Sequence, residues 1–178
     1  MDVVLRRTRA SDLDRVLALE RATENAPYIG QWSLAQHSAA LASAEWEHWI
    51  IVCDGDEDTP EGFLIAQDLR AVGKGVYIKR IVARAKNRGV GRRALEWFIA
   101  HAFQELAAAF VWLAVFVHNE RARHVYRTLG FRFRGVPEAE ADAWLEVVGN
   151  PDRPALLMFL DAGDPAGSPH SHDGRRKS

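Results

Sequence analysis

The sequence predicts a single domain of mixed α/β (α+β) class, with a mixed sheet of about six to seven strands flanked by about four helices. Two patterns predict this fold class. Three β-type segments follow one another between residues 46 and 83 across short turns, which is typical of an antiparallel meander. Residues 76 to 117 then have the pattern of a strand, a helix and a strand, and such a crossover makes its two strands parallel.

Composition sets the first limits on function. The chain has 178 residues, of which 48% are hydrophobic, so it can bury one ordinary core. A formal charge of −1 argues against nucleic acid as a partner. No apolar run has the length of a membrane helix, the N-terminus has no signal-peptide layout, and Cys53 is the only cysteine. We therefore expect a cytoplasmic protein without a metal, a membrane or a nucleic acid as partner.

The first segments lead to a helix with an unusual face. Val3 to Arg6 forms an edge or second strand, and Ser11 or Asp12 can cap the helix that follows. Leu13, Val16 and Leu17 make its apolar face, and the next positions of the same stripe are Glu20 and Glu24. Either the helix end leaves the core and both glutamates are solvated, which we favour, or this end lines a polar pocket.

The middle of the chain forms a second helix and the meander. Asn25 to Pro27 breaks the first helix, and a loop with Tyr28 and Trp32 follows. Ser33 caps a helix over about Leu34 to Ala42. The three strands of the meander are Trp46 to Cys53, Gly62 to Leu69 and Val76 to Ala83.

The second half of the chain continues with helices and strands in alternation. After Gly91 the apolar residues recur with a period of 3.6, which predicts a helix to about Leu106. Phe110 to Val117 is apolar on both faces and is expected at the centre of the sheet. Asn119 caps the next helix and Gly130 ends it. The late strands are Phe131 to Val136 and Ala155 to Leu160, separated by an irregular insert, Pro137 to Pro154. Residues 1–160 make up the domain, and 161–178 form a flexible polar tail.

The turn between the third strand and its helix predicts a phosphate site. It is basic and contains Gly89 and Gly91, so backbone N–H groups, a helix N-terminus and cationic side chains come together there. Residues 89 to 94 fit the dinucleotide pattern G-x-G-x-x-A. That pattern requires the first glycine directly after the strand, whereas five residues intervene here, and the next strand does not end in an acid.

Two longer motifs resemble those of the GCN5-related N-acetyltransferases (GNAT). Lys86-Asn87-Arg88-Gly89-Val90-Gly91 is similar to the R/Q-x-x-G-x-G/A motif, apart from its opening lysine. Residues 119 to 131, NERARHVYRTLGF, match N-x-x-A-x-x-x-Y-x-x-x-G-F throughout. The resemblance covers about residues 1 to 160 and implies the GNAT fold, in which the central parallel strands splay apart. It further implies an enzyme that transfers the acetyl group of acetyl-coenzyme A, its co-substrate, directly to a primary amine.

The resemblance also implies roles for particular residues. The N–H groups of Arg88 to Arg92 would cradle the pyrophosphate, and the edge of Ile81 to Ala83 would pair with the pantetheine arm. The N–H of Val82 would stabilise the oxyanion, Asn119 would contact the arm, and Tyr126 would protonate the departing thiolate. The implied cofactor-binding residues are Ile81, Val82, Ala83, Arg88, Gly89, Val90, Gly91, Arg92, Asn119 and Tyr126. By periodicity alone, Tyr126 is a core residue and Asn119 a helix cap.

The general base and the acceptor are open at this stage. No acid lies between Leu69 and Leu95, so the strand before the glycine turn lacks the glutamate that many relatives carry. We favour Glu24 as the base; Glu20, His118 and a water chain are the alternatives. The acceptor is an amine of a small molecule, or a protein N-terminus or lysine, and its loops are 25–33 and 137–154, with Tyr28, Trp32 and Trp144. A non-catalytic acyl-coenzyme A-binding or sensing domain is the alternative function, and a homodimer is compatible with the sequence.

Overall fold

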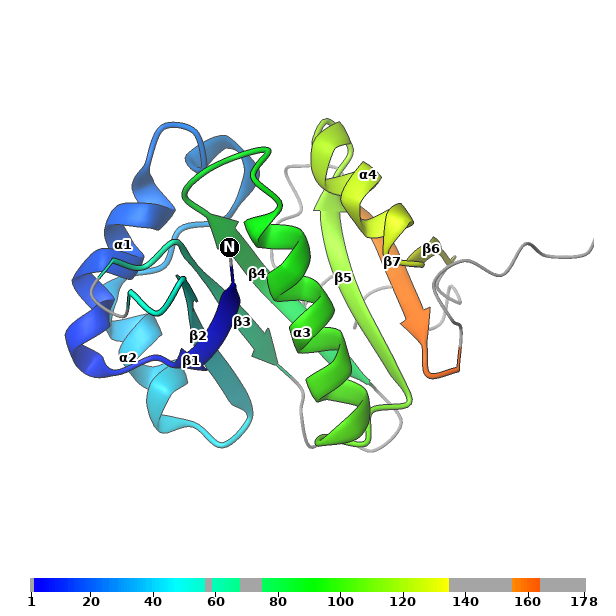
Figure 1. The fold of residues 1–178 in the computed structure, drawn as a ribbon, viewed down its shortest axis with the longest axis horizontal. Helices are drawn as coiled ribbons and strands as arrows, with labels where there is room; N and C mark the ends of the chain where they lie inside the picture. The colour runs from blue at the N-terminus through cyan, green and yellow to red at the C-terminus, as the bar shows by residue number, and fades with distance from the viewer. Residues whose placement is uncertain (1, 57–58, 68–74, 135–154, 164–178) are drawn as a thin grey trace, which may run out of the picture.

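The computed structural model describes residues 2–56, 59–67, 75–134 and 155–163, which form a twisted sheet with helices on both faces (Figure 1). In chain order, the elements are β1 (Val3–Arg7), η1 (Ala10–Asp12), α1 (Leu13–Arg21), η2 (Ala26–Tyr28), α2 (Leu34–Ala42), β2 (Trp46–Cys53), β3 (Gly62–Gln67), β4 (Val76–Ala83), α3 (Val90–Gln104), β5 (Phe110–Phe116), α4 (Glu120–Thr128), β6 (Arg132–Phe133) and β7 (Ala155–Asp161). The two η elements are 3-10 turns.

The sheet is mixed, as the sequence predicts. Its seven strands have the order β1-β2-β3-β4-β5-β7-β6, and β4 with β5 is its parallel pair. The β2-β3-β4 meander is antiparallel, and β1 lies at the edge. The predicted strands Trp46–Cys53 and Val76–Ala83 and the predicted helix Leu34–Ala42 agree with the structure at both ends. These predictions are confirmed.

Two capping predictions have different outcomes. Ser33 accepts a hydrogen bond from the N–H of Gln36, whose side chain in turn accepts from the N–H of Ser33, and this capping box starts α2. Neither Ser11 nor Asp12 caps α1 through its side chain, because η1 precedes that helix. The Asp12 carboxylate instead binds Arg6 at 2.8 Å, and this hydrogen bond lowers the pKa of Asp12.

The alternation of side chains along the strands builds a core on each face of the sheet. On one face, Trp49, Ile51 and Leu64 pack with α3 and α4 residues such as Phe98 and Tyr126. On the other, Ile50, Val52, Phe63 and Ile65 pack with Val16 and Leu19 of α1 and with Trp32. Figure 1 shows α3 and α4 in front of the sheet and α1 and α2 at its other side.

An irregularity in β4 decides which side chains reach each face. Opposite β3, Ala66 pairs with Ile78 and Ile65 pairs with Arg80, so Lys79 is an extra residue, a β-bulge. Ile78 therefore lies in the α3 core, whereas Val82, an even number of residues away, lies in the α1 core. Without the bulge, both would share one face. The bulge thus brings Arg80 to the α1 side.

The parallel pair separates just beyond the bulge. β4 and β5 pair only from Val76 with Val111 to Ile78 with Leu113, although both strands continue to Ala83 and Phe116. Figure 1 shows the two strands diverging toward the end where α3 begins. The splay that the resemblance implies is confirmed.

Some sequence predictions lie outside the described residues. These include the insert from residue 137 to 154 with Trp144, the last two residues of the strand predicted at 131–136, and the tail from residue 164. The described part of that predicted strand contains the shorter β6, Arg132–Phe133. In the described part of the chain, no helix is long and apolar enough to cross a membrane.

Candidate active site

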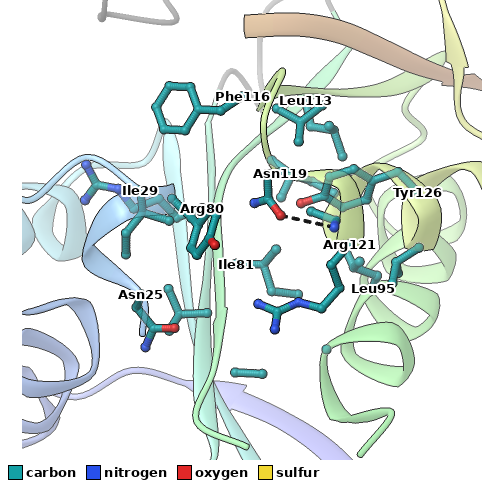
Figure 2. Close-up of a pocket in the computed structure, with 18 of the residues that line it drawn as sticks. Asn25, Ile29, Arg80, Ile81, Leu95, Leu113, Phe116, Asn119, Arg121 and Tyr126 are labelled. Atoms are coloured by element: carbon teal, nitrogen blue, oxygen red, sulfur yellow. Dashed lines mark hydrogen bonds between the residues drawn. The ribbon is translucent and has the colours of Figure 1, made fainter. Parts of the chain in front are cut away.

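A cleft of about 480 Å³ occupies the space between the splayed strands. Its walls come from the loop that contains η2, from β4, from the N-terminus of α3, from β5 and from α4 (Figure 2). Leu95 and Tyr126 line it from the α3 side, and Trp32 and Arg80 line it from the α1 side. The cleft therefore has lining residues from both faces of the sheet.

The N-terminus of α3 fits a pyrophosphate. Gly89 is the N-cap with φ +78°, a left-handed conformation that favours glycine, and the N–H groups of Val90, Gly91 and Arg92 precede the first intrahelical bond, from Arg93 to Gly89. A Cβ at Gly91 would have Ala83 Cβ, at 3.7 Å, as its nearest neighbour. The space in front of these N–H groups is open, so the residues present fit a phosphate ligand.

The expectation for the N–H of Val82 is wrong. The N–H of Arg84 donates to Glu61 O at 2.7 Å, on the β3 side of β4. Alternate residues of a strand direct their backbone groups to the same side, so the N–H of Val82 also points to β3. The N–H groups of Ile81 and Ala83 point to the splay instead, and these two residues line the cleft. The sequence predicts the strand, but it does not predict which of its residues direct their N–H groups to β3, because the bulge decides this.

Asn119 and Tyr126 lie where the motif predicts. Asn119 Oδ1 accepts from the N–H of Ala122 at 3.2 Å, so it caps α4 while also lining the cleft. The Tyr126 ring belongs to the α3 core and is 9% exposed, and Figure 2 shows its hydroxyl directed into the cleft. Burial raises the pKa of Tyr126 to about 12, which keeps the phenol protonated at neutral pH. Core packing and a position in the site are thus compatible.

The basic side chains around the turn have separate positions. Arg92 lines the cleft and binds Glu96 at 2.9 Å. Arg88 is exposed and is not among the lining residues, so the structure does not place its side chain with the others. Lys86 Nζ donates to Asn25 Oδ1 and, at 2.5 Å, to Ala83 O. Burial is the larger cause that lowers the pKa of Lys86, and the positive charge of Arg121 is the second. Sequence reasoning missed Arg121, which lines the cleft from α4 beside the motif's asparagine (Figure 2).

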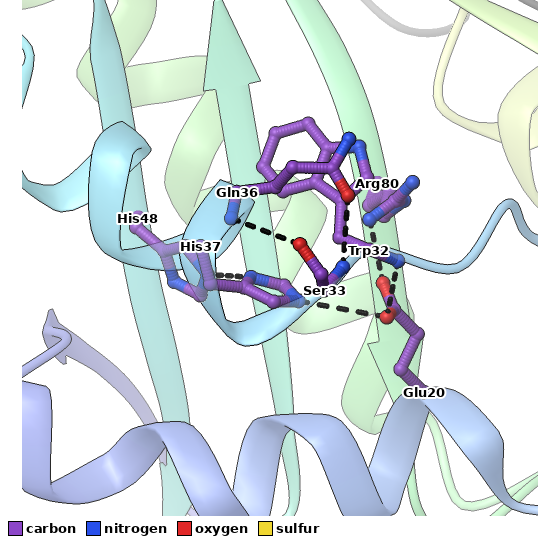
Figure 3. A network of polar contacts seen from close by, with 7 residues as sticks. All are labelled: Glu20, Trp32, Ser33, Gln36, His37, His48 and Arg80. Carbon is purple, nitrogen blue, oxygen red and sulfur yellow. Dashed lines mark hydrogen bonds and ion pairs between the residues drawn. The ribbon is translucent and has the colours of Figure 1, made fainter.

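Glu20 is fully buried, so the interpretation that it is solvated is wrong. Its Oε1 accepts from Arg80 Nη1 at 2.5 Å, and its Oε2 accepts from the N–H of Trp32 at 2.8 Å (Figure 3). His37 Nε2 lies 3.5 Å from the same Oε2. These partners compensate the burial of the charge. The signal was present in the sequence, since Glu20 continues the inward stripe of α1.

The other base candidates lie at the rim or outside. Glu24 is exposed and does not line the cleft, so the geometry does not place its carboxylate at the site. His118 is exposed as well, and its ring lies 5.6 Å from those of Tyr28 and Phe116, which line opposite walls. None of the described residues that line the cleft is an aspartate or a glutamate. The described residues also contain no cluster of potential metal ligands.

Solved structures with the same fold include a spermidine N-acetyltransferase from Vibrio cholerae in complex with coenzyme A and spermine. It has a TM-score of 0.72 and 14% identity, and the match covers 91% of this chain and 96% of that one. A chimera of that enzyme has a TM-score of 0.71 and 15% identity, with 90% and 96% covered. A domain from Methanocaldococcus jannaschii has a TM-score of 0.68 and 11% identity, with 90% and 99% covered. At such identities the likeness shows the fold.

Sequence comparison identifies the family. No curated protein matches the chain. The model of the acetyltransferase (GNAT) family matches residues 13–131, which include the glycine turn, the splayed strands and the motif of α4. The chain therefore belongs to the GNAT family of acyl-coenzyme A-dependent N-acetyltransferases, which transfer an acetyl group from acetyl-coenzyme A to an amine.

Proposed function

We propose that the protein acetylates a primary amine directly, in a ternary complex with acetyl-coenzyme A, and that Tyr126 is the general acid. The observation that supports this best is the Tyr126 hydroxyl. It has no hydrogen-bond partner among the described residues, and it points into the cleft from a ring that the core holds in place (Figure 2). A buried donor of this kind is suited to a leaving group that gains negative charge.

The described residues can assist each part of the transfer. The neutral amine nitrogen bonds to the thioester carbon, the C–S bond then breaks, and sulfur leaves with its electron pair and takes a proton from Tyr126. The nitrogen loses its surplus proton, by way of water, to the Tyr126 phenolate, which restores the phenol. An outward N–H of β4, which we assign to Ile81, stabilises the oxyanion between these events. The N–H groups of Val90, Gly91 and Arg92 hold the pyrophosphate.

A positive cleft removes the need for a carboxylate base. The described lining contains five lysines or arginines and no acid, and nearby positive charge lowers the pKa of an amine. The pKa of Lys86 in this cleft is lowered by burial first and by the charge of Arg121 second. An acceptor amine in the same field is more readily neutral. We propose that it loses its proton to water at the mouth of the cleft, and we do not assign the base to Glu24.

The charge of the site argues against a polyamine acceptor. The Vibrio cholerae enzyme acts on spermidine and was solved with spermine, both of which are polycations. In this chain the described lining offers such a molecule no carboxylate and several like charges. We therefore do not extend polyamine acetylation to this protein.

A free-thiol assay tests the proposal. The protein is incubated with acetyl-coenzyme A and a panel of amino acids, simple amines, aminoglycosides and peptides, and thiol release is followed against a control without amine. Amine-dependent release with formation of the N-acetyl product is expected. If calorimetry detects coenzyme A binding while no member of the panel raises thiol release above the control, the proposed enzyme activity is wrong and a binding domain is the better description.

A further inference from the structure

We infer that the acceptor carries a carboxylate beside its amine, and that the guanidinium of Arg80 binds this carboxylate. This inference rests on the proposed acetyl transfer and specifies the substrate class of the same site. It predicts amino acids or related small amino-carboxylic acids as acceptors. Simple amines and diamines are then poor ones.

Arg80 is buried, yet part of its guanidinium is directed into the cleft. The residue is 7% exposed and lines the cleft from β4 (Figure 2). Nη1 donates to Glu20, and the other N–H donors of Arg80 have no hydrogen-bond partner among the described residues. Neither Nε nor Nη2 is among the described side-chain atoms that are fully enclosed and lack a partner, so both keep some exposed surface. A carboxylate can accept two parallel hydrogen bonds from such an edge.

The surroundings hold this guanidinium in one orientation. The Trp32 ring lies against it, with 4.5 Å from the ring centroid to Cζ, and Glu20 fixes Nη1 (Figure 3). Behind Glu20, a row of hydrogen bonds runs from His37 Nδ1 to His48 Nε2 at 3.1 Å and from His48 Nδ1 to Thr8 Oγ1 at 2.8 Å. Burial lowers the pKa of His48 to about 3, so the imidazole is neutral.

One pair of tautomers accounts for both hydrogen bonds of the row, while His37 Nε2 faces Glu20 Oε2 at 3.5 Å without a hydrogen bond. If His37 presents its Nε2–H to Glu20, its Nδ1 accepts from His48 Nε2–H, and His48 Nδ1 accepts from the Thr8 hydroxyl. His37 and the N–H of Trp32 face one carboxylate oxygen of Glu20, which leaves the other oxygen for Arg80. The network orients the arginine without itself lining the cleft.

A glycine keeps the loop side chain off one of the unused donors. The loop before α2 passes Arg80 at Gly30, where a Cβ would lie 3.2 Å from Nη2. Tyr28, Trp32 and Gln36 line the same end of the cleft. This end is on the α1 face of the sheet, whereas the N-terminus of α3 and Tyr126 are on the other. Arg80 is thus placed away from the pyrophosphate site, where an acceptor would enter.

The charge of the cleft agrees with this assignment. Its described lining has Lys79, Arg80, Lys86, Arg92 and Arg121 and no acid. The carboxylate of Glu20 contacts Arg80 from the side away from the cleft, because Glu20 does not line the cleft. A second ammonium group on the acceptor would therefore be repelled, and a carboxylate would be attracted.

Matched acceptors test the inference. Thiol release is measured with phenylalanine, phenylalaninamide and phenethylamine, and with 4-aminobutyrate, butylamine and 1,4-diaminobutane. Within each set the amine is retained and only the second group changes. In each set we expect kcat/KM, calculated for the neutral form of the amine, to be at least about tenfold higher for the acceptor with a carboxylate than for the other acceptors. A charge-assisted hydrogen bond implies a difference of this size.

Arg80→Lys provides the residue-specific test. The lysine keeps a positive charge beside Glu20, but it lacks the planar guanidinium whose N–H groups can bind both oxygens of a carboxylate. We expect KM for the carboxylate acceptor to rise at least about tenfold, and the preference for this acceptor over its matched carboxylate-free amine to fall by the same factor. Arg15→Lys, an exposed position on α1 that does not line the cleft, is the matched control.

A binding measurement keeps the test independent of turnover and of the variant's stability. N-acetylphenylalanine and N-acetylphenethylamine are titrated by calorimetry into wild-type protein saturated with coenzyme A, and only the former should bind measurably tighter. Equal or better use of carboxylate-free amines, together with equal binding of the two products, would overturn the inference and leave acetyl transfer intact. Absence of amine-dependent thiol release with every acceptor would instead overturn the proposed function, and this inference with it.

Discussion

Replacing Tyr126 with phenylalanine removes one hydroxyl and leaves the ring. The ring is 9% exposed and packs 5.9 Å from Phe131 in the α3 core, so Tyr126→Phe should conserve the packing. The hydroxyl has no partner among the described residues, so its loss breaks no hydrogen bond and leaves no buried group unsatisfied. We therefore expect the free energy of unfolding to stay within about 0.5 kcal/mol of wild type or to increase.

The expected effect on catalysis is much larger. General acid catalysis contributes about 10²- to 10⁴-fold, and an acid is most effective when its pKa is near the working pH. Burial raises the pKa of Tyr126 to about 12, so the hydroxyl is a weak acid whose pKa is well above the working pH. This places the expected loss of kcat near the lower limit, about 100-fold.

Three measurements on the same preparations separate the explanations. Thiol release gives kcat, calorimetry gives the Kd for coenzyme A, and urea denaturation gives stability. We expect a loss of kcat with Kd and stability nearly unchanged. A kcat within about threefold of wild type, in a protein that is otherwise active, would refute the acid role of Tyr126.

Three other predictions concern the cofactor end, the buried histidine and pH. Gly91→Ala should raise the Kd for coenzyme A about 10- to 100-fold without loss of stability, because the new methyl has room in the fold and takes the space of a phosphate; unchanged calorimetric Kd would contradict the pyrophosphate site. His48 has a pKa of about 3 when folded and 6.5 as a model value, so the unfolded state binds more protons between these values and wild-type stability falls as pH falls. Between pH 7.5 and 5 this contribution is about 2 kcal/mol, and urea denaturation of His48→Gln should show a correspondingly flatter pH dependence. Because the Tyr126 phenol has a pKa of about 12, its ionisation should cause no decline of kcat between pH 7 and 10, which a pH profile checks.

Local sequence signals predicted most of the fold. Ser33 marks the start of α2, and runs of mainly apolar residues between turn residues mark β2 and β4. These features depend on neighbours within a few positions, so a sequence displays them directly. The same holds for the motif of α4, where Asn119 serves as both cap and cleft residue.

Contacts between distant segments were not predictable in the same way. The partner of Glu20 is 60 residues away in the sequence, and only the packing of α1 on the sheet brings the two together. The bulge at Lys79 depends on how β4 pairs with β3, and it reverses the parity of every later residue of the strand. Val82 was assigned the wrong hydrogen-bonding side, and Arg80 was passed over, for this reason.

The most direct test of the site is a crystal structure of the protein with coenzyme A. The account predicts the pyrophosphate on the N–H groups of Val90 to Arg92, the pantetheine arm between β4 and β5, and the sulfur within hydrogen-bond reach of the Tyr126 hydroxyl. Coenzyme A bound outside the splay, or with its sulfur out of reach of Tyr126, would contradict the account.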